Sequence, residues 1–209
     1  MDKLFEYRGV SDLVAAEIIK DDAETFETDN PFEIAGVSEI GKSTEASSDT
    51  HYYDNVAAVV IESTGKDTIQ MNTSAIPLDT LANITGQDYD ETTGTFIEGE
   101  RTTKYFALGY KTKKTNGKEV YVWRLKGTFS IPDSTHKTED EGTEANGQTM
   151  TYTGISTVHE FAKTGKRARA VNTDLEKDLV DVSTFFDEVQ TPDTLKAKTQ
   201  SKAPAKANA

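Results

Sequence analysis

The chain has 209 residues, a formal net charge of −13 and no cysteine. Without cysteine it has no disulfide framework, no thiolate metal ligand and no cysteine nucleophile, and its acidity differs from the basic footprint of a duplex-binding protein. Its hydrophobic residues, 35% of the total, occur in short runs that alternate with polar residues, which is typical of β-strands with one solvated face.

The first quarter of the chain predicts an arm, two strands and a polar loop. Residues 1–10 scatter apolar side chains among charged ones and are expected to form an extended arm. Residues 13–21 fit either a helix face or a strand, and the β-rich character of the chain favours a strand. Residues 34–40 alternate as a half-buried strand does. Residues 41–54 have no hydrophobic anchor before their tyrosines, so they are predicted to form a long, functional or mobile loop.

A strand pair and a helix are expected next. Residues 56–63 and 67–72 predict two strands joined by a short turn at Gly65. Residues 77–86 carry the best helix pattern of the chain, because their apolar side chains fall on one face. A proline at position 77 suits the first helical residue, and Gly86 suits a left-handed C-terminal cap.

The clearest β signal lies in the middle of the chain. Residues 104–113 and 119–126 alternate apolar and polar side chains. The Asn116-Gly117 pair between them favours positive φ angles, so it predicts a tight hairpin. Residues 127–131 are expected to continue as a further strand.

The last part of the chain mixes strand, helix and tail patterns. Residues 148–156 predict a strand, and residues 158–162 with 167–171 predict a hairpin. Residues 183–189 predict a short helix with a serine or threonine cap. Residues 195–209 are rich in lysine, alanine, threonine and proline, so they are expected to be disordered.

No sequence motif indicates catalysis or cofactor binding. The glycines are too dispersed for a phosphate-binding loop, and no Gly-x-Ser-x-Gly motif is present. The histidines, His51, His136 and His159, lack the spacing of a metal site. The acidic run at 139–141 lies in a polar loop and lacks the spaced ligands and glycine of a calcium loop, so a solvated loop is the favoured interpretation. We therefore expect no catalytic residue, no cofactor and no metal ion.

Two features of the hairpin at 104–126 have competing interpretations. Its aromatic side chains indicate either a stacking platform for sugars or bases or cross-strand core packing, which we favour. Its lysines indicate either complementarity to an acidic surface, such as another copy of the chain, or simply an exposed turn, and both interpretations stay open. The aromatic residues are Tyr105, Phe106, Tyr110, Tyr121, Trp123 and Phe129, and the lysines are Lys111, Lys113, Lys114 and Lys118.

Three segments carry a resemblance to a known family. They read IPLDTLANITG at 76–86, YFALGYK at 105–111 and YVWRLKG at 121–127, with an acidic stretch and the Asn-Gly turn between them. In order and spacing, from about residue 9 to residue 171, the chain resembles the major tail tube proteins of long-tailed, non-contractile bacteriophages of Gram-positive bacteria. That family has no catalytic residue, so none is transferred.

The resemblance implies a mainly β fold in which two packed antiparallel sheets form a β-sandwich or half-barrel with one short flanking helix. By the resemblance, subunits of this kind form hexameric rings that stack into a hollow conduit for the genome, and their inner sheets join into one continuous barrel. The implied organisation is an arm at 1–10, a β domain at 11–172 with an inter-ring loop at 41–54 and a helix at 77–86, a C-terminal extension at 173–194, and a disordered tail at 195–209.

The implied partners are further copies of the chain, the tape measure protein, the tail terminator and distal tail proteins. Double-stranded DNA is expected to pass the acidic lumen without specific binding. No signal peptide or membrane span is evident, so the protein is expected to be soluble, assembled in the host cytoplasm and located in the virion tail. The alternatives are a carbohydrate-binding or adhesin module using the aromatic hairpin around Trp123 and, least favoured, an enzyme with catalytic carboxylates.

Overall fold

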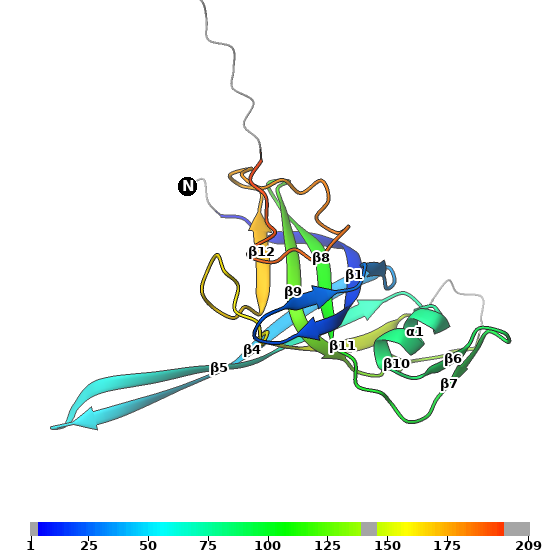
Figure 1. The fold of residues 1–209 in the computed structure, drawn as a ribbon, viewed down its shortest axis with the longest axis horizontal. Helices are drawn as coiled ribbons and strands as arrows, with labels where there is room; N and C mark the ends of the chain where they lie inside the picture. Colours follow the sequence, from blue (N-terminus) through cyan, green and yellow to red (C-terminus); the bar gives the residue numbers. More distant parts are fainter. Residues whose placement is uncertain (1–3, 139–145, 199–209) are drawn as a thin grey trace, which may run out of the picture.

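The protein is mainly β, as the sequence predicted, and the computed structural model describes residues 4–138 and 146–198. Ten strands form one antiparallel sheet, and β6 and β7 form a separate two-stranded sheet beside the short helix (Figure 1). The elements are β1 (Tyr7–Asp21), β2 (Phe26–Thr28), β3 (Phe32–Glu33), β4 (Val37–Tyr53), β5 (Val56–Thr73), α1 (Leu78–Thr85), β6 (Asp88–Asp90), β7 (Thr95–Ile97), β8 (Phe106–Lys114), β9 (Glu119–Phe129), β10 (Asp133–Ser134), β11 (Gln148–Ile155) and β12 (Ala170–Asp174).

The large sheet follows the order β2-β1-β8-β9-β11-β5-β4. In addition, β3 pairs with β1, β12 with β9, and β10 with β11. Among the described residues this sheet does not close into a barrel. Its order places the ends of β4 and β5, which reach far beyond the other strands, at one edge of the molecule (Figure 1).

Buried side chains lie on both faces of this sheet. Neighbours in sequence alternate between the faces, as the strand period requires: Phe106 lies on one face and Ala107 on the other. We call the larger cluster the inner core; helix α1 adds Leu81 and Ile84 to it. We call the second cluster the outer core, and it consists of Ala16, Ala107, Trp123, Leu125, Phe161, Val171, Phe185 and Val189.

The hairpin of β8 and β9 confirms the strongest sequence prediction. Gly117 in its turn has φ +84°, the left-handed conformation that the Asn-Gly pair favours. The predicted strands at 13–21 and 148–156 are confirmed as parts of β1 and β11. Residues 127–129 belong to β9 and do not form a further strand.

The predicted helix is confirmed as α1, with two details at its ends. Pro77 stands just before the helix with ψ 142° and acts as its cap, so the proline is not the first helical residue. Gly86 takes the predicted left-handed conformation with φ +69°, and the next N–H, of Gln87, donates to the Ala82 carbonyl at 3.0 Å. The cap therefore satisfies carbonyls that the helix end leaves free.

The predicted loop at 41–54 is wrong, because residues 41–53 belong to β4. The strand is paired with β5 from Val37↔Thr73 to Tyr53↔Val56, so backbone pairing holds it in place without hydrophobic anchors. The predicted turn at Gly65 is wrong for the same reason: this glycine lies inside β5. The turn falls at Asp54 and Asn55, which have φ angles of 51° and 64°.

The predicted hairpin at 158–171 is also wrong. Only an isolated bridge, Phe161↔Lys166, forms there, and β12 pairs with β9 instead. The registers Ile155↔Lys126 and Ala170↔Arg124 show that β12 continues along β9 where β11 leaves it. Residues 156–169 therefore make an excursion between two collinear strands, and β12 runs across the expected domain boundary at position 172.

The segment 175–198, which we call the C-terminal strip, covers the outer core. The predicted helix at 183–189 is wrong: the N–H of Phe185 donates to Val182 and that of Asp187 to Thr184, both at 3.2 Å, which makes turns. Burial of Phe185 and Val189 against the sheet holds the backbone in that shape. The predicted disorder of residues 195–209 is wrong for residues 195–198, because the Lys198 N–H donates to the Leu179 carbonyl at 2.8 Å.

The N-terminal arm is shorter than predicted. Residues 7–10 belong to β1, with Tyr7 paired to Lys114 and Val10 to Thr112. Residues 1–3, the acidic run at 139–141 and residues 199–209 lie outside the described residues.

Candidate interaction surface

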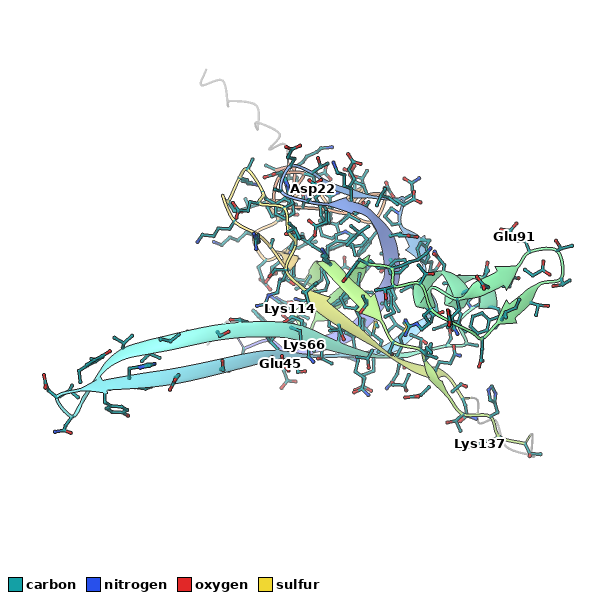
Figure 2. All side chains as sticks on the ribbon, turned by 60° about the horizontal axis from the view of Figure 1, so that its bottom comes forward. Asp22, Glu45, Lys66, Glu91, Lys114 and Lys137 are labelled. Atoms are coloured by element: carbon teal, nitrogen blue, oxygen red, sulfur yellow. The ribbon has the colours of Figure 1, made fainter. Side chains whose placement is uncertain are left out.

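The outer part of the β4–β5 hairpin is exposed along almost its whole length. It leaves the body near Glu45 and Lys66 and projects as a two-stranded ribbon (Figures 1 and 2). We call residues 46–64 the distal hairpin. An isolated two-stranded hairpin is at best marginally stable in water, and none of the described strands pairs with this ribbon as a third one.

The distal hairpin exposes aliphatic side chains. Residues 56–61 read VAAVVI, and Val59, Val60 and Ile61 are 47%, 56% and 54% exposed. The tip adds the exposed rings of Tyr52 and Tyr53. Runs of consecutive exposed apolar residues are avoided in monomeric proteins unless they are functional.

Both faces of the ribbon carry apolar side chains. His51 pairs with Val59 and Asp49 with Ile61, so these four residues share one face. Val60, between them, points to the opposite face with its partner Thr50. A single flat surface therefore cannot cover all of the exposed apolar side chains of the distal hairpin.

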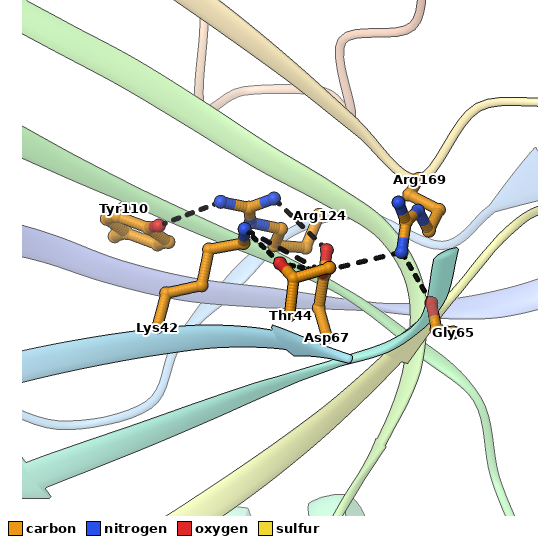
Figure 3. Close-up of polar contacts among 7 residues, drawn as sticks. All are labelled: Lys42, Thr44, Gly65, Asp67, Tyr110, Arg124 and Arg169. Carbon is orange, nitrogen blue, oxygen red and sulfur yellow. Dashed lines mark hydrogen bonds and ion pairs between the residues drawn. The ribbon is translucent and has the colours of Figure 1, made fainter. Parts of the chain in front are cut away.

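A charged cluster anchors the hairpin where it leaves the body (Figure 3). The carboxylate of Asp67 on β5 is surrounded by Lys42 Nζ at 3.7 Å, Arg124 Nη1 at 3.4 Å and Arg169 Nη1 at 3.5 Å. It also accepts a hydrogen bond from the Thr44 hydroxyl at 2.7 Å. Asp67 is almost fully buried, and we call these five residues the Asp67 cluster.

The Asp67 cluster has more positive than negative charge. Three cations face one carboxylate, and Arg124, which is 8% exposed, has an Nε without a hydrogen-bond partner among the described residues. The guanidinium of Arg124 also donates to the Tyr110 hydroxyl at 3.5 Å. Arg169 in addition donates to the Gly65 carbonyl, which fixes the point of divergence between hairpin and body.

A cavity of about 630 Å³ adjoins this cluster. Lys42 and Arg124 supply its charged wall, and β1, β4, β8, β9 and β12 all contribute to it. Val10, Ile40 and Val122 give it apolar surface. The cavity thus combines positive charge with apolar contacts, which suits an acidic group carried on a partly apolar segment.

A second buried carboxylate, Asp21 at the end of β1, joins three parts of the body. It accepts hydrogen bonds from Lys126 at 2.6 Å and from the backbone N–H groups of Val158 and His159 at 2.9–3.0 Å. Burial alone would raise the pKa of Asp21, but the Lys126 contact and the two backbone donors outweigh it and hold that pKa below its usual range. Asp21 therefore links the sheet to the 156–169 excursion.

The aromatic side chains of the β8–β9 hairpin pack mainly in the two cores, as favoured from the sequence. Phe106 and Phe129 contact each other in the inner core at a centroid distance of 5.5 Å. Trp123 is fully buried in the outer core, where its Nε1 donates to the Phe185 carbonyl at 2.9 Å. Only Tyr105 is exposed by more than a third. Trp123 thus offers no free ring face for stacking a sugar.

Two of the four lysines at the tip of this hairpin have ion-pair partners within the chain. Lys111 lies 2.9 Å from Asp12, and Lys114 lies 2.5 Å from Asp174. Their carboxylate contacts raise the pKa of both lysines. An intramolecular role therefore accounts for these two residues.

The three histidines do not meet. His51 lies on the distal hairpin, 3.6 Å from Asp49, whereas the ring of His159 packs edge-on against Phe161. Within the part of the chain that the structure describes, no group of three or more histidine, aspartate and glutamate side chains is placed to hold a metal ion.

The Asp67 cluster and the distal hairpin were not anticipated from the sequence. Asp67, Arg124 and Arg169 are far apart in sequence, and no spacing rule joins them. The hairpin did leave a signal, since residues 56–61 form an apolar run without polar alternation. Such a run is typical of a buried segment, whereas Val59, Val60 and Ile61 are exposed in this chain.

Neither a family model nor a curated protein sequence matches this chain. Among residues 4–138 and 146–198, no helix is both long and apolar enough to cross a membrane.

Proposed function

We propose that the chain is a self-assembling structural subunit of a bacteriophage tail tube, of the long-tailed, non-contractile type. Its copies form rings, hexameric in the family it resembles, and stacked rings make a hollow conduit for the genome. The chain then acts without catalysis, cofactor or metal ion. Its further partners are the tape measure protein, the tail terminator and distal tail proteins, and it is located in the virion tail after assembly in the host cytoplasm.

The observation that carries this proposal is the distal hairpin. Its two strands pair with each other as far as the tip, yet Val59, Val60 and Ile61 remain exposed on two faces. A subunit that functions alone has no use for this surface, whereas neighbours in an assembly cover it. In a stacked tube the hairpin takes the inter-ring role that the family resemblance implies for residues 41–54.

The curvature of the sheet gives further support. The large sheet bends until β1 and β4 come into contact, which suits the half-barrel form of a sandwich-like tube subunit. The free outer edge of β4 is an unpaired strand edge, which isolated proteins protect and assemblies pair. Joining such edges across copies closes a sheet into a barrel that no single chain completes.

The charge of the chain is compatible with a conduit for DNA. A net charge of −13 repels phosphates, so DNA slides without being retained by fixed contacts. We therefore expect no measurable binding of duplex DNA to assembled tubes at physiological salt.

Negative-stain electron microscopy with light scattering, across a concentration series, tests the proposal. We expect hollow rings or tubes, whose fraction rises with concentration. The variant Val59→Ser/Val60→Ser/Ile61→Ser should abolish them, because it removes apolar area from both faces of the hairpin.

The matched control is Ile19→Ser/Ile131→Ser/Leu179→Ser, which alters three equally exposed aliphatic residues of the body. It should assemble as the unaltered protein does. A monodisperse monomer at every concentration, also when a preformed tail tip is added as initiator, would overturn the proposed function.

A further inference from the structure

The base of the β4–β5 hairpin and the region of the β6–β7 hairpin differ in charge. The Asp67 cluster, with its excess of positive charge, lies at the base of the β4–β5 hairpin (Figure 3). The β6–β7 hairpin lies on the other side of the body, where Figure 2 shows Glu91 far from Glu45 and Lys66. Every charged residue between positions 68 and 100 is an acid.

The acids around the β6–β7 hairpin are not used within the chain. Among the described residues, Asp88, Glu91, Glu98 and Glu100 are exposed and have no ion-pair partner. Asp90 differs, because it accepts hydrogen bonds from Thr92 and Thr93 and shapes the turn. The hairpin is thus held in a defined form with its other carboxylates free.

The cationic side is built to receive such a group. Arg124 is buried, its Nε has no partner among the described residues, and it lines the 630 Å³ cavity together with Lys42. Lys42 and Arg169 keep about a third and a quarter of their side-chain surface exposed. Since Asp67 neutralises only one of the three cations, a further carboxylate lowers the electrostatic energy of the cluster.

We propose that the Asp67 cluster and its adjoining cavity bind the acidic β6–β7 hairpin of a second copy of this chain. The binding groups are the cations Lys42, Arg124 and Arg169. The exposed Ile97 of β7 meets the apolar part of the cavity wall. Donor and acceptor surfaces lie on opposite sides of one chain, so the contact is head-to-tail. Contacts of this type repeat from copy to copy, closing into rings or extending as filaments. The inference rests on the proposed self-assembly and identifies one of its contacts.

Carbodiimide cross-linking tests the contact directly and also detects weak association. The reagent activates a carboxyl group, the lysine amine displaces it to form an amide, and the reagent leaves as its urea. In a mixture of ¹⁴N- and ¹⁵N-labelled protein, mass spectrometry distinguishes cross-links between copies from those within one. We expect mixed-isotope links from Lys42 to Glu91 or Glu98. The pair Lys66 and Glu45, 3.7 Å apart, provides an intramolecular reference.

Charge reversal tests the contact in the assembled protein. Glu91→Lys/Glu98→Lys should raise the concentration at half-assembly by about tenfold or more, since like charges then face each other. The control Glu24→Lys/Glu27→Lys makes the same change in net charge at exposed acids of the β1–β2 region and should assemble normally. Combining Lys42→Glu with Glu91→Lys should restore part of the loss.

The outcomes separate the inference from the proposed function. If the unaltered protein forms rings but Glu91→Lys/Glu98→Lys assembles equally well, or Lys42 links only to other sites, the inference is overturned and the proposed function stands. If no particles and no mixed-isotope links form at all, both fail. A short DNA duplex bound by the protein and released by Lys42→Gln/Arg169→Gln would instead identify a phosphate site and overturn the inference.

Discussion

The inner and outer halves of β5 make the same kind of pairing with β4 but have opposite environments. In the inner half, Ile69 and Met71 are fully buried, because β11 pairs on the other edge and the inner core lies below. In the outer half, Val60 and Ile61 are exposed although their pairing with β4 continues. Backbone pairing therefore extends a hairpin, but only a third strand and a packed layer bury its side chains.

This comparison predicts that core residues of the body control stability and hairpin residues do not. Trp123→Ala should show the largest effect, a loss of about 3–5 kcal/mol in the free energy of unfolding, because it leaves a large cavity in the outer core. Chemical denaturation followed by circular dichroism measures it. A loss below about 1 kcal/mol would show that the C-terminal strip does not depend on this ring.

The second effect is expected at the junction between the two halves. Asp67→Asn leaves Arg124 and its neighbouring cations without their buried carboxylate, so we expect a loss of about 3 kcal/mol in the free energy of unfolding. Lys42→Gln, which alters the most exposed cation of the cluster, should lower the free energy of unfolding by less than about 1 kcal/mol. Equal effects of the two substitutions would contradict the central position of Asp67.

A smaller effect concerns pH. Because the folded-state pKa of Asp21 is lowered, its carboxylate contributes stability that is fully present above its unfolded pKa of about 3.9. That contribution is lost as the pH falls through the lower folded-state pKa. The destabilisation caused by Asp21→Asn, measured by urea unfolding, should therefore shrink between about pH 6 and about pH 3. A pH-independent difference would assign the effect to packing.

The smallest effect is expected on the distal hairpin. Val60→Ser should change the free energy of unfolding of the monomer by no more than about 0.5 kcal/mol, because the Val60 side chain is exposed and buries little apolar area. In hydrogen exchange of the monomer, amides of residues 56–63 should exchange quickly and those of residues 67–72 slowly. Equal protection of both halves would mean that the ribbon is already covered in solution.

The sequence allowed good prediction of segments whose local chemistry decides their conformation. Asn116-Gly117 fixes a hairpin and Gly86 ends a helix, and neither depends on distant residues. The mainly β class followed from alternating apolar residues, which the assignment of Phe106 and Ala107 to opposite cores explains.

Segments shaped by distant partners were predicted poorly. Residues 41–54 looked like a loop because both faces of their strand meet water, which removes the alternation that marks a half-buried strand. Residues 183–189 have a helical pattern, but burial of Phe185 against Trp123 requires turns instead. The Asp67 cluster joins residues of β4, β5 and β9 with Arg169, which directly precedes β12. No rule based on neighbouring positions in the sequence detects such a cluster.

The C-terminal strip also has a consequence for the timing of biosynthesis. It is translated after every strand that it covers, so the outer core lacks Phe185 and Val189 on the nascent chain until residues 175–198 leave the ribosome. The inner core, by contrast, can form as soon as β11 is complete. Folding of the subunit therefore finishes on its outer face, and a chain stalled before the strip would expose an aromatic surface to chaperones.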